Sequence, residues 1–286
     1  MEVLVHFVAP ALVGVLIGIA SGLLGIGGGT VMVPIFRLAF GMSATMSTAT
    51  SLFAIIPTSI SGAISHAKGE TCIPALGIAA GLGGACLSPV GVWLAQLSPD
   101  WLVMFAAALI IGYSAINMFK KAFKLRPAGQ PATGVDAAAA ASLTSSGDAA
   151  AAAPTADDSS LSRKQLLQGA AIGLVAGLAS GYVGVGGGFI MVPLMLSIIG
   201  IPMRKASGTS LIAVMILAIP GVIEQGIIGN INYLAGIAIV IGTIPGAVIG
   251  ARLVTKVPER TLRLLFGCFL IVAAVMLVLN EVGIFG

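Results

Sequence analysis

Residues 20–34 read ASGLLGIGGGTVMVP, and residues 179–193 read ASGYVGVGGGFIMVP. Each copy places a run of glycines inside an otherwise apolar stretch. Interrupted hydrophobic segments at matching positions of two halves are typical of transporters whose binding site lies at the interruption. The sequence therefore predicts two broken helices inside a membrane.

The composition predicts an all-α polytopic membrane protein. Hydrophobic residues make up 58% of the chain, charged residues 8%, and the mean hydropathy is +1.10. A soluble protein of this length carries roughly a quarter charged residues. Basic residues in cytoplasmic loops account for the net charge of +4, so this charge does not indicate nucleic-acid binding. Three cysteines stand alone in apolar segments, so no metal site or cofactor is expected.

The repeat extends far beyond the glycines. Ser21 corresponds to Ser180, and the spacing between these two serines, here called the repeat offset, continues without a gap. The matched pairs include Gly41 with Gly200, Thr50 with Thr209, Gly62 with Gly221, Gly91 with Gly250, and Pro99 with Pro258. We therefore expect a first membrane repeat over residues 1–126 and a second over residues 163–286. Residues 127–162 are rich in Ala, Ser, Gly and Pro, which predicts a flexible linker.

Each repeat contains five hydrophobic segments. In the first they are residues 3–24, 31–40, 46–65, 73–97 and 101–119, and in the second residues 166–183, 189–199, 207–228, 233–254 and 262–279. The second segment of each repeat is shorter than the roughly 20 residues that a spanning helix needs. The glycine-broken pair of segments either crosses the membrane and returns or forms a re-entrant hairpin that ends near the midplane, and the sequence leaves both open.

The basic residues predict the orientation. If the linker is cytoplasmic, thirteen of the fourteen Lys and Arg residues fall on the cytoplasmic side and only Arg37 falls outside. Both termini are then periplasmic. A signal peptide begins with Lys or Arg, and no Lys or Arg precedes the first apolar segment, so we expect this segment to be a retained span. The two halves start on opposite sides, so the sequence predicts an inverted-topology repeat.

The glycine runs predict an anion site. A helix that begins after each break leaves N–H groups free at its positive end, and two such ends can hold an anion without Lys or Arg. Hydroxyl groups at the start of the next segment are expected to join them. The candidate substrate-binding residues are Gly25, Gly27, Gly28, Gly29, Thr30, Thr50, Ser51, Gly184, Gly186, Gly187, Gly188, Thr209 and Ser210.

Other glycines have a simpler interpretation. Glycines spaced four apart in membrane helices serve close helix packing. This describes Gly14, Gly18 and Gly22, Gly173, Gly177 and Gly181, and Gly242, Gly246 and Gly250. A nucleotide-binding loop is excluded, because Thr30 and Phe189 occupy the place of the third glycine in Gly-x-Gly-x-x-Gly.

Few ionisable residues are available for ion coupling. His66 and Glu224 lie near the ends of their segments, where an interfacial position is the simplest interpretation and proton coupling is the alternative. The sequence contains no Ser/His/Asp set, zinc spacing or carboxylate pair, so we expect no catalytic residues and no enzyme.

The paired Gly-x-Gly-Gly-Gly runs, each followed by a proline, and the paired Thr-Ser-Leu motifs resemble the sulfite exporter TauE/SafE family of the toluenesulfonate uptake permease superfamily. The resemblance covers both halves and leaves out the linker. It implies a bacterial inner-membrane secondary transporter that exports sulfite or small organosulfonate anions by alternating access, coupled to the proton gradient. An importer of a sulfur-containing or other small anion is the alternative, and a membrane-embedded enzyme is less favoured. Whether the chain forms a homo-oligomer stays open.

Overall fold

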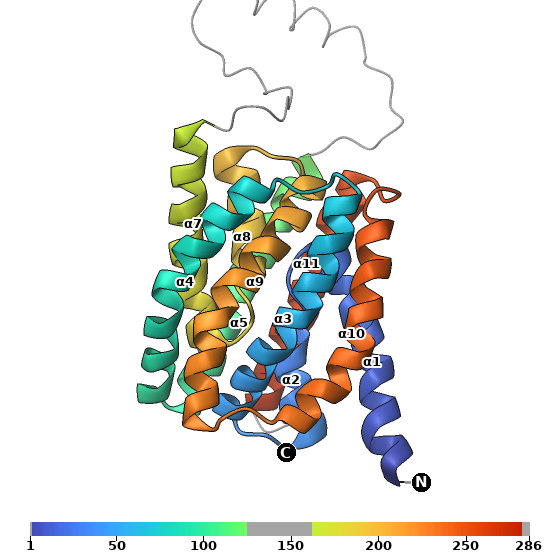
Figure 1. Cartoon of the computed structure of the whole chain (residues 1–286), viewed down its shortest axis with the longest axis vertical. Helices are drawn as coiled ribbons and strands as arrows, with labels where there is room; N and C mark the ends of the chain where they lie inside the picture. The colour runs from blue at the N-terminus through green and yellow to red at the C-terminus, as the bar shows by residue number, and fades with distance from the viewer. Residues whose placement is uncertain (1, 125–161, 282–286) are drawn as a thin grey trace, which may run out of the picture.

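A computed structural model describes residues 2–124 and 162–281 (Figure 1). Every regular element in these ranges is a helix, which confirms the all-α prediction. The predicted linker of residues 127–162 lies outside the described residues, apart from Ser162. That serine caps the helix that follows it, since its side chain accepts a hydrogen bond from Lys164 N.

The first half contains five helices, and the second half repeats the pattern with one π-helical turn. The helices of the first half are α1 (Glu2–Leu24), α2 (Gly29–Phe40), α3 (Ala44–Lys68), α4 (Pro74–Leu97) and α5 (Asp100–Lys124). Those of the second are α7 (Arg163–Val183), α8 (Gly188–Leu194), η1 (Met195–Ile199), α9 (Met203–Ile228), α10 (Tyr233–Leu253) and α11 (Glu259–Glu281). The π-helical η1 follows closely on Pro193, whose ring removes a helical hydrogen bond.

Seven helices in the described part of the chain are long and apolar enough to cross a membrane: α3, α4, α5, α7, α9, α10 and α11. The apolar helices at residues 10–24, 29–40 and 188–199 are shorter. The chain is therefore a polytopic membrane protein, and the short second segment expected in each half is present as α2 and as α8 with η1.

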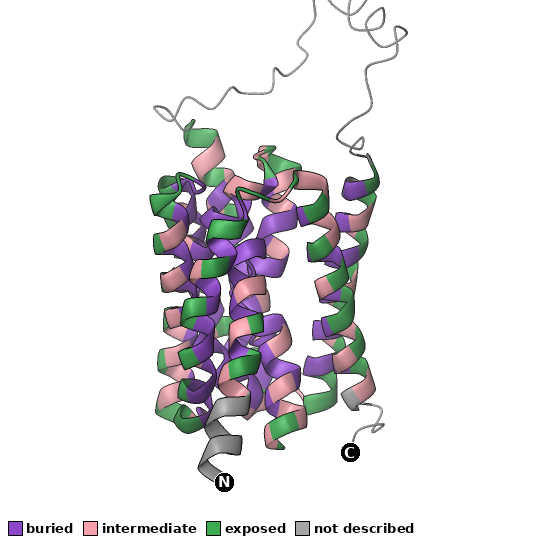
Figure 2. Cartoon of the chain, turned by 90° about the vertical axis from the view of Figure 1, so that its right-hand side faces the viewer, coloured by how far each residue is buried: buried purple, intermediate pink, exposed green. Residues whose placement is uncertain are grey.

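Two pairs of packed helices organise the bundle, α3 with α9 at the centre and α5 with α11 at one outer face (Figure 2). In Figure 1, α4 and α7 lie on one side of these pairs, and α1 and α10 lie on the other. The short helices lie between these two pairs, because α2 contacts both α3 and α11 while α8 contacts both α9 and α5.

Glycine allows the closest of these helix contacts. A Cβ atom added to Gly18 of α1 would lie 2.4 Å from the carbonyl oxygen of Thr243 in α10. One added to Gly177 of α7 would lie 2.1 Å from the carbonyl oxygen of Gly84 in α4. The interpretation of the four-spaced glycines as packing surface is confirmed, because a methyl group would push these backbones apart.

Hydrogen bonds that cap the helices recur with the repeat offset. Ala44 N, at the start of α3, donates to Asp100 Oδ2 over 3.2 Å, and Met203 N, at the start of α9, donates to Glu259 Oε1 over 3.3 Å. A carboxylate at a helix N-terminus satisfies a free donor and favours the positive end of the helix dipole. In both halves, therefore, an acidic residue of one helix fixes the start of another.

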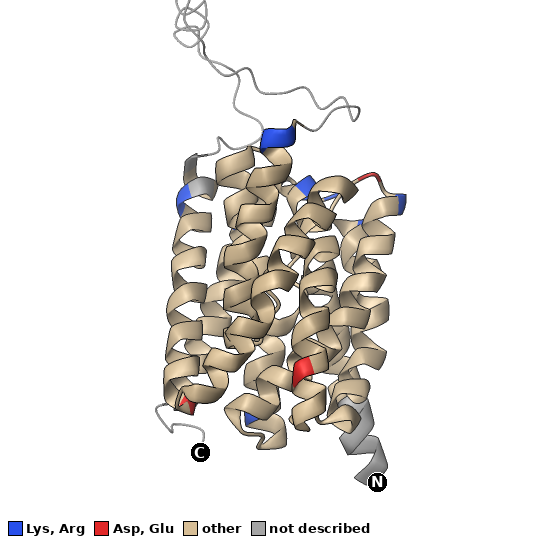
Figure 3. Cartoon of the chain, turned by 60° about the vertical axis from the view of Figure 1, so that its left-hand side comes forward, with Lys and Arg blue, Asp and Glu red and all other residues tan. Residues whose placement is uncertain are grey.

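The surface of the bundle is that of a membrane protein. Buried residues fill the interior, and many large aliphatic side chains lie exposed along the outer faces, such as Leu16, Leu109 and Ile227 (Figure 2). Lys and Arg residues gather mainly at the end of the bundle from which the chain leaves α5 and enters α7 (Figure 3). The helical walls between the two ends carry few charges, as a hydrocarbon environment requires.

Candidate functional site

Both glycine runs break the helices at the predicted positions. Between α1 and α2, Gly25, Gly27 and Gly28 have φ values of 75°, 75° and 84°. Between α7 and α8, Gly184, Gly186 and Gly187 have φ values of 73°, 87° and 65°. Residues that carry a side chain rarely adopt this left-handed backbone conformation, so these two sharp reversals of the chain require glycine.

The two breaks touch one another in the interior. A Cβ atom added to Gly29 would lie 2.5 Å from the carbonyl oxygen of Val185, and one added to Gly188 would lie 2.6 Å from that of Gly25. Residues 21–30 and residues 183–189 are all buried. The structure thus brings together the glycines that the sequence singled out, and each run provides a wall for the other.

The lengths of the short helices indicate the depth of this contact. Helix α2 has 12 residues, and α8 and η1 contribute 7 and 5. Each return arm is therefore about 18 Å long, which slightly exceeds half of a hydrocarbon core of roughly 30 Å. Two arms of this length that start at opposite faces would meet close to the midplane.

Each break leaves backbone donors free. In the first, Val31 N and Met32 N donate to the carbonyl oxygen of Gly28. The N–H groups of residues 27–30 make no hydrogen bond to the described part of the chain. In the second, Gly188 N donates to Gly186 O over 2.7 Å, which leaves fewer donors available. Buried donors of this kind are costly in a membrane unless a polar partner reaches them.

The candidate hydroxyls divide into two groups. Thr50 Oγ1 accepts a hydrogen bond from Asn232 N over 3.0 Å, and Thr209 Oγ1 accepts one from Ile73 N over 2.9 Å. These two threonines cap the starts of α10 and α4 and lie in equivalent structural positions. Their main visible role is therefore to join helices of the two halves.

The remaining candidate hydroxyls do not cap the start of a helix of the other half. Ser210 Oγ donates to Gly25 O over 2.6 Å and also lies 2.8 Å from Ser207 O. Thr30 and Ser51 are fully buried, and their hydroxyl oxygens find no hydrogen-bond partner among the described residues. Because these hydroxyls are unpaired in the described part of the chain, Thr30 and Ser51 are more available than the threonine caps to bind a ligand.

Two apolar side chains next to the glycines were missed by the sequence interpretation. A Cβ atom added to Gly27 would lie 2.9 Å from Val214 Cγ1 and 3.2 Å from Ile55 Cγ2. One added to Gly186 would lie 2.8 Å from Ile55 Cδ1 and 3.5 Å from Val214 Cγ1. Ile55 and Val214 are related by the repeat offset, and that relation is the signal that could have found them.

Buried serines near the breaks were also missed as candidates. Ser21 and Ser180 precede the two glycine runs, and Ser59 Oγ would lie 3.4 Å from a Cβ atom on Gly27. All three side chains are fully buried, and their hydroxyl oxygens have no partner in the described chain. Ser21 and Ser180 belong to the repeated motif itself, so the repeat again contained the signal.

The two candidate proton-coupling residues occupy different environments. His66 lies in the last turn of α3, and its side chain is fully buried in the protein. Its Nε2 lies 2.7 Å from Gly22 O, and its Nδ1 lies 2.7 Å from Thr71 Oγ1. Glu224 is half-buried one turn before the end of α9, and its Oε2 has no partner among the described residues. The two side chains are not joined by any hydrogen bond in the described structure.

These features define the class of protein. Broken helices that meet inside a polytopic bundle, with unpaired backbone donors at the contact, are the architecture of a membrane transporter. The comparisons with known proteins agree. The family described as "Sulfite exporter TauE/SafE" matches residues 10–277, and the chain therefore belongs to this transporter family.

Two relatives that align over most of their length are described as probable membrane transporter proteins, and a third aligns over a shorter stretch. The chain is 27% identical to "Probable membrane transporter protein YunE" of Bacillus subtilis (strain 168), over 98% of this chain and 99% of that protein. It is 26% identical to YdhB of the same organism over 88% and 92% of the two chains. "Sulfite exporter TauE/SafE family protein 3" of Arabidopsis thaliana is 30% identical over 37% of this chain and 23% of its own length. No solved structure matches the chain.

Proposed function

We propose that this protein is a secondary transporter that moves sulfite or a small organosulfonate across the bacterial inner membrane. In this proposal transport is export, driven by the proton gradient. The contact between the two glycine breaks carries the argument, because it brings two unwound backbones and several unpaired hydroxyls to one buried place. The description of the family names sulfite export, which agrees with an anion as the substrate.

The two halves act, we infer, as inverted repeats. Helices α1 and α7 begin at opposite ends of the bundle (Figure 1), and the contact of α1 with α10 corresponds to that of α7 with α4. The hydrogen bonds of Thr50 and Thr209 correspond in the same way. An orientation with the linker cytoplasmic and both termini periplasmic would then place the end rich in Lys and Arg inside.

The chemistry of the breaks suits a weakly basic oxyanion. A sulfonate stays ionised, and its oxygens accept hydrogen bonds from backbone N–H and hydroxyl groups. The free N–H groups of residues 27–30 lie at the positive end of α2, and Thr30 and Ser51 add hydroxyl donors. A site without Lys or Arg binds moderately, which permits release on the far side.

Alternating access requires the breaks to open toward each side in turn. In the structure, Ile55 and Val214 fill the space beside Gly27 and Gly186, and both are fully buried. We infer that these two side chains close the site and move away from the glycines when either hairpin rocks. Because they belong to α3 and α9, movement of the central helix pair would couple the two hairpins.

Transport by purified protein in liposomes tests this function. The liposomes are loaded with labelled sulfite or sulfoacetate, and efflux is followed with and without an imposed pH gradient. We expect efflux by the wild type and a strong loss in Gly28→Ala. A Cβ atom on Gly28 comes closest to the methyl groups Ile17 Cγ2 and Met32 Cε, at 3.0 and 3.1 Å, and its three nearest neighbours are all side-chain atoms, so the variant is expected to fold.

Gly41→Ala and Gly200→Ala are the matched controls. Both residues have positive φ values, 61° and 78°, and an added Cβ atom would meet nothing within 4 Å. They therefore suffer the same backbone strain as Gly28→Ala, without touching the breaks. Equal efflux by the wild type, the control variants and a folded Gly28→Ala would refute the glycine site, and wild-type liposomes that release neither anion would refute the substrate class.

A further inference from the structure

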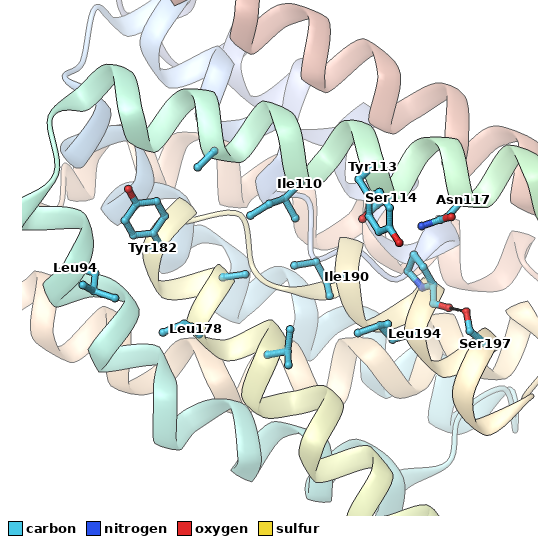
Figure 4. A pocket seen from close by; sticks show the side chains of 14 residues that line it. Leu94, Ile110, Tyr113, Ser114, Asn117, Leu178, Tyr182, Ile190, Leu194 and Ser197 are labelled. Atoms are coloured by element: carbon cyan, nitrogen blue, oxygen red, sulfur yellow. Dashed lines mark hydrogen bonds between the residues drawn. The ribbon is translucent and has the colours of Figure 1, made fainter.

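A groove of about 670 Å³ lies along the second glycine-broken hairpin, between α5 on one side and α4, α7 and α8 on the other (Figure 4). Its walls are mostly apolar and include Ala106 and Ile110 of α5, Leu178 and Ala179 of α7, and Leu194 of α8. Val175 and Tyr113, which also line it, are 56% and 66% exposed. The groove therefore opens on the outer surface of the bundle, where lipid lies.

Polar side chains gather at one end of this groove. Figure 4 shows Tyr113, Ser114, Asn117 and Ser197 close together, while Leu94 and Tyr182 lie at the opposite end. Ser114 is only 4% exposed, and neither Ser114 nor Asn117 has a side-chain hydrogen bond to the described part of the chain. Unpaired amide and hydroxyl groups at membrane depth are costly, so they indicate a polar ligand atom at this end.

The repeat provides an internal comparison. By the repeat offset, Tyr113, Ser114 and Asn117 correspond to Val272, Ala273 and Met276 of α11. Ser197 corresponds to Leu38 of α2. Because the equivalent positions in the other half are apolar, helix packing does not require polar side chains there. The polar end is thus a feature of this groove and not of the architecture.

The position of the polar end suits a phospholipid. Asn117 lies one turn before Lys120, an exposed residue near the end of α5. Arg163 and Lys164 begin α7 at the same end of the bundle. One helical turn is about 5.4 Å, so the amide lies just below the basic rim, at the depth of lipid ester groups. Basic side chains beside a groove between membrane helices are typical of sites for anionic lipid head groups.

We propose that this groove binds an anionic glycerophospholipid from the leaflet at the linker end of the bundle. One acyl chain lies along the apolar wall toward Leu94 and Tyr182. The ester oxygens accept hydrogen bonds from Ser114, Asn117 and Tyr113, and the phosphate lies near Lys120. Because Ile190 and Leu194 of the glycine-broken hairpin form part of the wall, the bound lipid would also support that hairpin.

The binding test uses the full chain, purified with an equimolar mixture of dioleoylphosphatidylglycerol and dioleoylphosphatidylcholine. Native mass spectrometry is expected to find retained phosphatidylglycerol on the wild type. Ala106→Phe, which fills the groove, should reduce retention about tenfold. Leu109→Phe is the matched control, since Leu109 lies on the same helix, is 60% exposed and does not line the groove.

A second variant tests the polar end without filling the groove. Ser114→Ala with Asn117→Met installs the residues of the other half, and it should lower lipid retention while leaving the thermal unfolding temperature unchanged. A phosphatidylglycerol with a photoreactive acyl chain should label peptides of α5, α7 and α8. Retention that is equal in all variants, or labelling confined to other helices, would overturn the proposal. Displacement of the lipid by an alkyl sulfonate would also overturn it, because the groove would then serve the transported substrate.

Discussion

The imidazole Nε2 of His66 lies 2.7 Å from the carbonyl oxygen of Gly22, which joins α3 to the last turns of α1 just ahead of the first glycine break. A carbonyl oxygen only accepts hydrogen bonds, so Nε2 must carry a proton. In the other half the equivalent residue is Gln225, whose Oε1 accepts from Asn230 Nδ2 over 2.8 Å. The two halves thus hold a titratable residue and a neutral amide in equivalent places.

His66→Gln tests whether this difference underlies proton coupling. The substitution installs the residue of the other half, so the protein should fold and still transport. We expect the stimulation of efflux by a pH gradient to fall about tenfold, because the neutral amide cannot exchange a proton. Efflux with and without the gradient is the measurement. Gradient stimulation that stays at the wild-type level would assign proton coupling elsewhere, with Glu224 as the next candidate.

Two substitutions of Thr50 distinguish a structural role of its hydroxyl from a role in substrate binding. Thr50→Val removes the acceptor of Asn232 N and should cost about 1 kcal/mol of stability, whereas Thr50→Ser should keep the bond. Thermal unfolding in detergent measures this difference. If Thr50→Val instead unfolds like the wild type but loses efflux, the hydroxyl binds substrate.

The closing role of Ile55 and Val214 predicts a leak. Val214→Ala would enlarge the space beside Gly27, and efflux should become less dependent on the pH gradient while its rate rises several-fold. Ile55→Ala should act similarly and should also cost about 2–5 kcal/mol through the cavity it creates. The counter-evidence would be tightly coupled efflux in both alanine variants.

The effect of a glycine-to-alanine substitution on stability should depend on the space available for the added Cβ atom. Gly177→Ala would place its Cβ atom 2.1 Å from Gly84 O, so α4 and α7 must separate, at a cost of about 1–3 kcal/mol or more. Gly112→Ala meets nothing within 4 Å and should raise stability by about 0.5–1 kcal/mol through better helix propensity. Thermal unfolding of both variants distinguishes packing glycines from tolerant ones.

Orientation can be measured with single cysteines. Arg37→Cys, in the last turn of α2, and Lys205→Cys, in the first turn of α9, should react with a membrane-impermeant thiol reagent from opposite sides. The background requires substitution of Cys86 and Cys268, which are exposed, and of the buried Cys72. Reaction of both positions from one side would contradict the inverted repeat.

The sequence alone determined much of this protein, because hydrocarbon allows a chain few options. Long apolar segments must become helices, and residues 20–34 and 179–193 contain glycine runs that favour a break in the helix. The all-α fold, the approximate positions of the helices and the two breaks therefore followed from local composition, whereas the π-helical turn η1 did not. The constant spacing between the two copies also identified which positions correspond.

Only the tertiary structure decided what touches what. Contact between Gly25 and Gly188, the caps formed by Thr50 and Thr209, and the burial of His66 all depend on helices far apart in the sequence. The local sequence around a serine, threonine or histidine does not reveal whether its side chain binds a neighbouring helix or a ligand. Packing determines which partner it reaches, and packing is a property of the whole bundle.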